Sequence, residues 1–166
     1  AGYDGADKRA DILASVIKSN GTIYDLTEFE HAYAPPYSSA KDPVNMAGFV
    51  AENILQNRLK VIYWHDIISA EQDGILVDVR SPEEYLESTI PGAISIPVDE
   101  LRSRMHELPK TENIYIFCQI GLRGYLAQRI LVQNGYGQVS NISGGFALWK
   151  AINEEKVLTR EGVSAL

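Results

Sequence analysis

The sequence predicts an α/β fold with a mostly parallel sheet and helices on both faces, preceded by a helical segment. From about residue 59 onward, short runs of β-branched and aromatic residues alternate with stretches of helical periodicity. Alternation of this kind is typical of parallel sheets covered by helices. The preceding part has helical patterns but no sheet of its own. We therefore divide the chain into residues 1–58, 59–155 and a polar tail over 156–166.

Residues 1–58 are predicted to form three helices, over residues 8–18, 25–32 and 43–58. Asn20 and Gly21 end the first helix, because both residue types tolerate the left-handed conformation that closes a helix. Asp42 is a favoured N-cap and Pro43 follows it in the first helical position. The prolines at 35–36 exclude a helix between the second and third segments. So small a helical segment should dock on the rest of the chain or on another chain.

The second part is predicted to alternate five strands with helices. The expected strands span residues 61–64, 75–79, 93–96, 113–117 and 137–142. The expected helices begin at Ser81-Pro82 and span residues 98–108, 123–134 and 145–152. Reactive groups in such folds gather at the carboxyl ends of the strands, which directs attention to the residues after 117.

Composition narrows the classes of function. The net charge of −7 argues against a general nucleic-acid surface, because phosphate binding needs clustered positive charge. No apolar run is long enough for a membrane span and no secretory signal is visible, so we expect a cytoplasmic protein without a membrane partner. One cysteine and three scattered histidines lack the spacing of zinc ligands, so no metal site is expected.

The single cysteine, Cys118, lies where a predicted strand gives way to a predicted helix. Backbone N–H groups, the helix dipole and Arg123 should favour a thiolate there and any anion attached to it. The alternative is a cysteine that only fills the core, but such a residue belongs within the strand's alternation rather than past its end. We predict that Cys118 is a nucleophile and that its binding loop consists of Gln119, Ile120, Gly121, Leu122, Arg123 and Gly124.

Other residues near the cysteine have two interpretations each. Gly121 permits the turn, although a glycine of any ordinary turn would look the same. Arg123 either balances a bound anion or pairs with a surface carboxylate. Asp78 and Arg80, at the end of a strand, are expected to brace the loop as a structural ion pair rather than to take part in chemistry.

Several separated stretches resemble the rhodanese family. They are Val-Asp-Val-Arg-Ser-Pro-Glu-Glu-Tyr at 77–85, Ile-Pro-Gly-Ala at 90–93, the cysteine loop, and Ser-Gly-Gly-Phe at 143–146 with Trp149. The resemblance implies the small rhodanese-like α/β fold and a sulfurtransferase that carries a persulfide on Cys118. It also implies a small sulfur donor and a thiol acceptor as partners. Ser88 and Thr89 stand where the family usually has Gly-His, so that histidine's contribution to local packing is absent.

The first part resembles a different family. Residues 33–48 are similar to the end of the dimerisation domain of coenzyme A disulfide reductases, some of which carry a C-terminal rhodanese domain. The resemblance implies that residues 1–58 are a remnant of that domain and that the parent enzyme is a homodimer using FAD, NAD(P)H and coenzyme A. It also places a tyrosine of this segment near the partner subunit's active site. Tyr33 and Tyr37 fit that role, and both equally fit a role as docking anchors.

This chain alone is not expected to reduce disulfides or to bind a cofactor. Its sequence contains no GxGxxG fingerprint for FAD or NAD and no second cysteine for a redox pair. The expected task of the parent is reduction of coenzyme A disulfide, persulfide or polysulfide, with sulfur passed between the two modules.

Two rival functions remain to be compared with sulfur transfer. Protein tyrosine phosphatases place five residues between cysteine and arginine, whereas four lie between Cys118 and Arg123, and Phe117 stands where phosphatases usually have histidine. The shorter loop suits one sulfur atom better than a phosphate. The uncharged side chains of residues 119, 120 and 122 also favour a persulfide or polysulfide donor over thiosulfate. The other alternative is a non-catalytic docking or redox-sensing module with a dimerisation segment.

Overall fold

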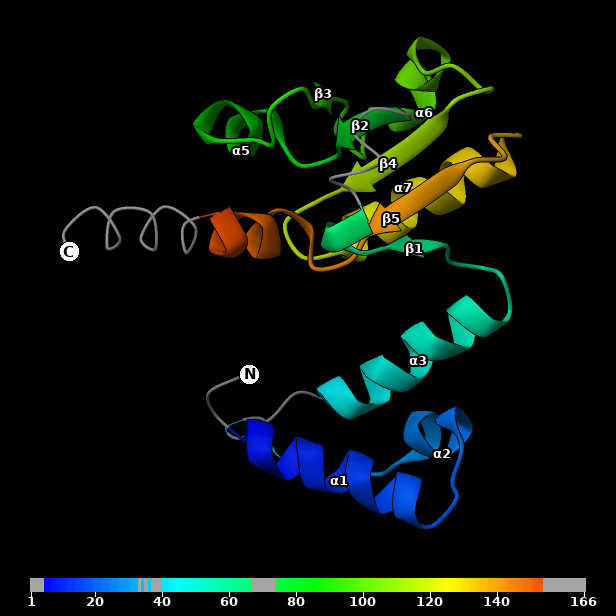
Figure 1. The fold of residues 1–166 in the computed structure, drawn as a ribbon, viewed down its shortest axis with the longest axis vertical. Coiled ribbons are helices and arrows are strands. Elements are labelled where there is room, and N and C mark those ends of the chain that lie inside the picture. Colours follow the sequence, from blue (N-terminus) through cyan, green and yellow to red (C-terminus); the bar gives the residue numbers. More distant parts are fainter. Residues whose placement is uncertain (1–4, 33, 35, 37–39, 67–73, 154–166) are drawn as a thin grey trace, which may run out of the picture. The chain divides into compact units, whose positions relative to one another are not determined.

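A computed structural model describes residues 5–32, 34, 36, 40–66 and 74–153 of the chain. The chain forms two compact units, Ala1–Arg58 and Leu59–Leu166, and each is described by itself (Figure 1). Among the helices of the described residues, none has the length and apolar character needed to cross a bilayer.

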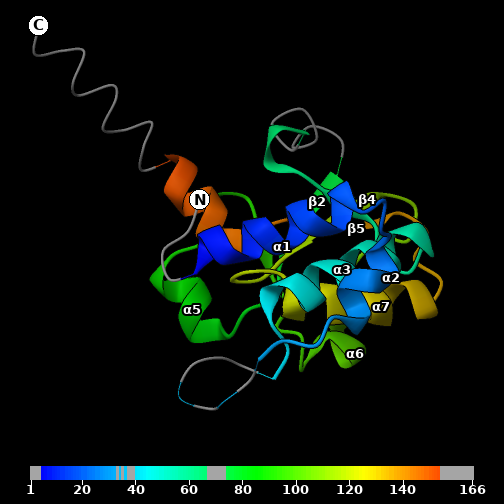
Figure 2. The ribbon, with the colours of Figure 1, turned by 90° about the horizontal axis from the view of Figure 1, so that it is seen from below.

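The first unit consists of α1 (Ala6–Lys18), α2 (Ile23–Glu28) and α3 (Pro43–Leu55). Helices α2 and α3 lie side by side in both views (Figures 1 and 2). The N-cap predicted at Asp42 is present, because its side chain accepts from the backbone N–H of Val44. The backbone N–H of Asp42 in turn donates to Oδ1 of Asn45. Arg9 of α1 donates to the same carboxylate at 3.0 Å, which joins α1 to the start of α3.

Two helices of this unit differ from the sequence prediction. The second helix, expected over 25–32, begins earlier because Thr22 and Asp25 form a capping box around its first turn. It ends at Glu28, and the carbonyl of the following residue, Phe29, accepts from the side chain of Asn45 at 2.9 Å. The third helix ends before the expected residue 58, because Asn57 adopts a left-handed φ of 54° and turns the chain.

The second unit is built on a five-stranded sheet in the order β1-β5-β4-β2-β3, and every neighbouring pair is parallel (Figure 1). Its strands are β1 (Val61–Ile62), β2 (Gly74–Asp78), β3 (Ile94–Ser95), β4 (Asn113–Phe117) and β5 (Val139–Ile142). The predicted parallel sheet is confirmed, although β1 and β3 are shorter than expected. Asp78 lies opposite Phe117 in the register, so the segments after β2 and β4 leave the sheet at the same edge.

Helices cover the sheet and meet two separate core clusters. These helices include α5 (Pro82–Glu87), α6 (Leu101–Arg104) with the 3₁₀ turn η1 (Met105–Glu107), α7 (Leu122–Gln133) and a helix over residues 145–153. Ile114 and Ile116 of β4 belong to one cluster with residues of α6 and α7. Phe117, which points to the other face, packs with Phe146 and Trp149 of helix 145–153. This alternation confirms a sheet buried on both faces.

The helix expected over 98–108 is broken. The N–H of Val98 donates to the carbonyl of Val79 at 3.2 Å, which holds this turn residue beside the end of β2. A turn follows, in which the N–H of Glu100 donates to Pro97, and only then does α6 begin. The short helix passes into η1, whose first carbonyl, at Met105, accepts from the hydroxyl of Tyr136. Tertiary hydrogen bonds at both ends therefore replace the continuous helix that the apolar pattern predicts.

Candidate active site

Cys118 lies between the end of β4 and the start of α7, on the strand-to-helix turn that the sequence predicts. Its side chain is 1% exposed and continues the alternation of Ile114 and Ile116 into the same core cluster. A cysteine that only fills the core would have the same burial, so burial does not separate the two interpretations of Cys118. Its sulfur nevertheless accepts a hydrogen bond at 3.1 Å from the backbone N–H of Gly121, which a packing residue does not require.

Gly121 has a backbone conformation that favours glycine. Its φ of 145° and ψ of −29° lie in a region that other residues rarely enter, while the space around its Cα is open. The glycine is therefore required by the turn and not by crowding. Its N–H faces the sulfur of Cys118, and its carbonyl accepts from the N–H of Tyr125 at 2.9 Å and from the side chain of Asn141 at 3.1 Å.

A second loop holds the backbone of the cysteine loop from the side of helix 145–153. The N–H of Phe146 donates to the carbonyl of Cys118 at 2.8 Å, and the N–H of Ala147 donates to that of Gln119 at 3.0 Å. Gly145 has a φ of 54°, and a Cβ there would overlap the carbonyl oxygen of Cys118. The Ser-Gly-Gly-Phe stretch thus uses the unpaired N–H groups of a helix start to fix the loop.

Asp78 and Arg80 form the buried ion pair that the sequence predicts, with 2.7 Å between Nη2 and Oδ2. Arg80 also donates to the carbonyl of Ser88 at 2.6 Å and to Oε1 of Gln119 at 3.4 Å. Thr89, which replaces the family's usual histidine, donates its hydroxyl to Asp78 at 2.8 Å. The pair braces the cysteine loop through Gln119, and Thr89 supplies a polar contact at the position where the histidine is missing.

Arg123 lies in the first turn of α7, and its guanidinium forms a two-point contact with Glu84 of α5. The Nη1–Oε2 and Nη2–Oε1 distances are 2.6 and 2.8 Å. The contact with Arg123 is the main cause that lowers the pKa of Glu84 to about 2, and the N–H of Ser81 lowers it further. The pKa of Arg123 is raised, first by Glu84 and to a smaller extent by Cys118. Arg123 thus pairs with a carboxylate, as one of its two interpretations predicts. It also interacts with Cys118.

The remaining residues of the predicted loop fall into two groups. Ile120 and Leu122 are 71% and 64% exposed and form an apolar rim beside the cysteine. Leu122 and Gly124 belong to α7 rather than to the loop. Gly124 is buried against Asn141, whose amide oxygen occupies the position that a Cβ would take. This close approach explains why residue 124 is a glycine, and the sequence alone did not predict it.

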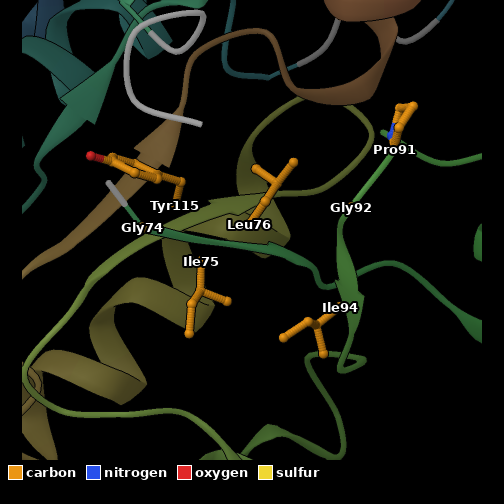
Figure 3. Close-up of a pocket in the computed structure, with 7 residues that line it drawn as sticks. All are labelled: Gly74, Ile75, Leu76, Pro91, Gly92, Ile94 and Tyr115. Atoms are coloured by element: carbon orange, nitrogen blue, oxygen red, sulfur yellow. The ribbon is translucent and has the colours of Figure 1, made fainter. Parts of the chain in front are cut away.

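Two other features lie apart from the cysteine loop. Tyr33 and Tyr37, the tyrosines expected near a partner subunit's site, lie outside the described residues. A cavity of about 350 Å³ is lined by Gly74, Ile75, Leu76, Pro91, Gly92, Ile94 and Tyr115 (Figure 3). It includes the amino-terminal half of β2, whereas Cys118 follows the carboxyl end of β4. A smaller cavity of about 150 Å³ is lined in part by Arg80 and Arg123 and so adjoins the site.

The arrangement suits a nucleophile that carries a small anionic group. The sulfur faces an amide N–H at the start of α7, where the helix dipole favours negative charge. Hydrogen bonds from two other elements fix the loop before any substrate arrives. A preorganised donor of this kind stabilises charge without reorganisation during the reaction.

Comparisons with known proteins agree with this geometry. The rhodanese-like domain family matches residues 64–152, which is more than half of the chain. A sulfurtransferase of Allochromatium vinosum is 41% identical over 78 residues, covering 47% of this chain and 73% of that protein. A coenzyme A disulfide reductase of Staphylococcus epidermidis is 55% identical over 51 residues, covering 31% of this chain and 12% of that protein.

Two solved structures resemble nearly the whole chain. Reduced Bacillus anthracis CoADR-RHD matches 92% of this chain and 27% of its own, with a TM-score of 0.85 and 50% identity. An NAD-dependent persulfide reductase from A. fulgidus matches 89% of this chain and 26% of its own, with a TM-score of 0.78 and 38% identity. The chain thus spans about a quarter of the length of both proteins. It belongs to the rhodanese-like domain family and contains a sulfurtransferase-type rhodanese domain related to those of persulfide and coenzyme A disulfide reductases.

Proposed function

We propose that this domain takes sulfur from a persulfide or polysulfide and passes it to a thiol, as the C-terminal module of a reductase of coenzyme A disulfide, persulfide or polysulfide. The observation that supports this donor class is the contact between Arg123 and Glu84, with 2.6 Å between Nη1 and Oε2. The guanidinium next to the cysteine already has a carboxylate partner, and residues 119–122 carry no charge. A persulfide, which has no sulfonate group to neutralise, suits this site better than thiosulfate does.

The transfer proceeds in two displacements. The thiolate of Cys118 attacks the terminal sulfur of a donor R–S–SH, the donor's S–S bond breaks, and R–S⁻ leaves while Cys118–S–SH forms. An acceptor thiolate then attacks the terminal sulfur, becomes a persulfide itself and regenerates the thiolate of Cys118. One S–S bond forms as another breaks in each step, so neither step needs an external oxidant or reductant. The N–H of Gly121 stabilises the sulfur of Cys118.

The reductive half of the parent reaction belongs outside this chain. FAD and NAD(P)H do not fit the residues present, because the sequence contains no GxGxxG fingerprint and no second cysteine. The similarity to CoADR-RHD over 92% of this chain supports a parent enzyme that binds these cofactors and coenzyme A elsewhere. Such an enzyme would work in the cytoplasm as a homodimer, with the first 58 residues contributing to the dimer.

A comparison of sulfur donors tests the proposed donor class. We expect polysulfide to load Cys118 at least about tenfold faster than thiosulfate, a difference of the size of one charge-assisted contact. Glu84→Gln should narrow the difference between the two loading rates, because it frees Arg123 to contact the sulfonate end of thiosulfate. Glu87→Gln, at the other end of α5, should leave the difference unchanged. Faster loading by thiosulfate in the unsubstituted chain would contradict the proposal.

A further inference from the structure

We infer that Asn141 is a positioning residue for sulfur transfer, because it holds Gly121, the residue whose N–H contacts Cys118. The inference rests on the role of Cys118 as sulfur carrier. Asn141 lies on β5, opposite Ile116 of the neighbouring β4, and only 6% of its surface is exposed. It comes from a different strand than the cysteine and does not itself bond to the sulfur, so it acts through other residues.

The first contact of Asn141 is with Gly121. Its Nδ2 donates to the carbonyl oxygen of Gly121 at 3.1 Å, and the N–H of the same glycine donates to Sγ of Cys118 at 3.1 Å. Glycine has the widest conformational freedom of any residue type. Gly121 adopts an unusual φ of 145°. A hydrogen bond to its carbonyl therefore restricts rotation about the Cα–C bond of a residue that would otherwise rotate easily. This restriction helps to keep the N–H, on the other side of the same Cα, directed at the sulfur.

The second contact of Asn141 is with Gly124, in the first turn of α7. The amide oxygen Oδ1 occupies the position that a Cβ on Gly124 would take, so a larger residue at 124 would displace the amide. The same side chain thus holds the last residue of the turn and fits closely against the helix that follows it. Through these two contacts, Asn141 holds both the cysteine loop and the first turn of α7 against β5.

Stability alone does not explain the choice of asparagine at this position. Oδ1 of Asn141 is buried and has no hydrogen-bond partner, which costs free energy of folding. The carbonyl of Gly121 already accepts from the N–H of Tyr125 at 2.9 Å. An apolar side chain of similar size would therefore leave no polar group unpaired. Gln128 also has a buried and unpaired amide oxygen, but its amide donates to Lys60 and Val139. Asn141 differs because its amide donates to the residue that contacts Cys118.

The test compares Asn141→Leu with Gln128→Leu in the full chain. Gln128 is a matched control, because its side-chain amide is also buried in the second unit and donates to Val139 and Lys60, at 2.7 and 3.0 Å. We expect Asn141→Leu to slow single-turnover loading of Cys118 by polysulfide at least about tenfold, with little change in thermal midpoint. Gln128→Leu should lower the midpoint and leave the loading rate within about twofold.

An NMR measurement keeps the inference independent of the sulfur chemistry. In the unsubstituted chain, the amide resonance of Gly121 should shift when Cys118 is alkylated, and this response should be lost in Asn141→Leu but retained in Gln128→Leu. Asn141→Ser, which keeps a small polar side chain, provides a second variant if the leucine variant does not fold, and it should lose most of the response.

Two results would overturn the inference. One is loading of Asn141→Leu within twofold of the unsubstituted chain, and the other is an unchanged response of the Gly121 resonance in either Asn141 variant. If the unsubstituted chain takes up no sulfur, the role of Cys118 as sulfur carrier fails instead. The response of Gly121 then still decides whether Asn141 positions the loop.

Discussion

The side chain of Cys118 packs in the core and also accepts a hydrogen bond at its sulfur. It is buried in the same cluster as Ile116, and it accepts from Gly121 on the turn into α7. Burial of this kind keeps the thiol close to its donor and away from bulk water. Under the proposed function, a persulfide or polysulfide would present its terminal sulfur to this buried thiol.

Substitution of Gly121 tests the requirement for an unusual backbone conformation. Gly121→Ala should destabilise the fold by about 1–3 kcal/mol and slow sulfur loading, because alanine is strained at a φ of 145°. The space for the added methyl group is open, so any effect comes from the backbone. Chemical denaturation and single-turnover loading measure the two effects.

Gly137→Ala is the control for this substitution. A Cβ at Gly137 also meets no atom within 4 Å, and its φ lies outside the left-handed range. This variant should be nearly neutral or slightly stabilised. Equal behaviour of the two alanine variants would contradict the conformational argument.

Much of the site was predictable at the level of residue types, but its supporting contacts were not. The cysteine, the turn glycine and the pair of Asp78 and Arg80 follow from residues adjacent to strand ends. Glu84 and Arg123 lie 39 residues apart, and no local pattern relates them. The contacts of Asn141 with Gly121 and Gly124 depend on the register of β5 against β4, which periodicity does not determine.

Helix α5 is joined to the cysteine loop through its N-terminal cap. The carboxylate of Glu84 accepts from the N–H of Ser81 at 3.0 Å, which completes the capping box, and it also accepts both bonds from Arg123 of α7. One side chain therefore stabilises the start of α5 and fixes the first turn of α7. The predicted capped helix start is confirmed, and its link to α7 is an additional finding.

The charge of Glu84 makes this link dependent on pH. Its pKa falls from 4.5 to about 2 in the folded protein, so the carboxylate stabilises the fold fully above pH 4.5 and loses this effect as the pH falls toward 2. Because the pair is partly exposed, we expect Glu84→Gln to cost about 1 kcal/mol at pH 7. The difference in free energy of unfolding between Glu84→Gln and the unsubstituted chain should shrink as the pH falls from 4.5 to 2. Urea unfolding across this range measures it.

Glu87→Gln on the same helix controls for the loss of a negative charge. It should show a smaller difference at pH 7, because Glu87 lies at the carboxyl end of α5, away from the capping box. A difference for Glu84→Gln that stays constant from pH 7 to pH 2 would contradict the assigned role of its carboxylate.

The elements with strong patterns were predicted well, and those set by tertiary contacts were not. Strands β2 and β4 and helix α7 fall within one residue of their expected bounds, because long apolar runs and clear periodicity specify them. The edge strands β1 and β3 are only two residues long, since each has a single neighbour in the sheet. Helix α6 is short because the bond between Val98 and Val79 delays its start.

At the scale of the whole chain, the candidate site belongs to one of the two compact units. All described groups around the cysteine belong to the second unit, which the rhodanese-like domain family covers over residues 64–152. The first unit has three helices and no strand among its described residues, which agrees with a segment that needs further packing partners. The proposed sulfur transfer uses described groups of the second unit alone.

Intact mass analysis after exposure to polysulfide tests the central claim most directly. The chain should gain the mass of one sulfur atom, lose it again on addition of a thiol acceptor, and gain none when Cys118 is replaced by serine. Peptide mapping should locate the added sulfur at Cys118. An unchanged mass in the unsubstituted chain, or an equal gain in Cys118→Ser, would contradict the assignment of Cys118 as the sulfur carrier.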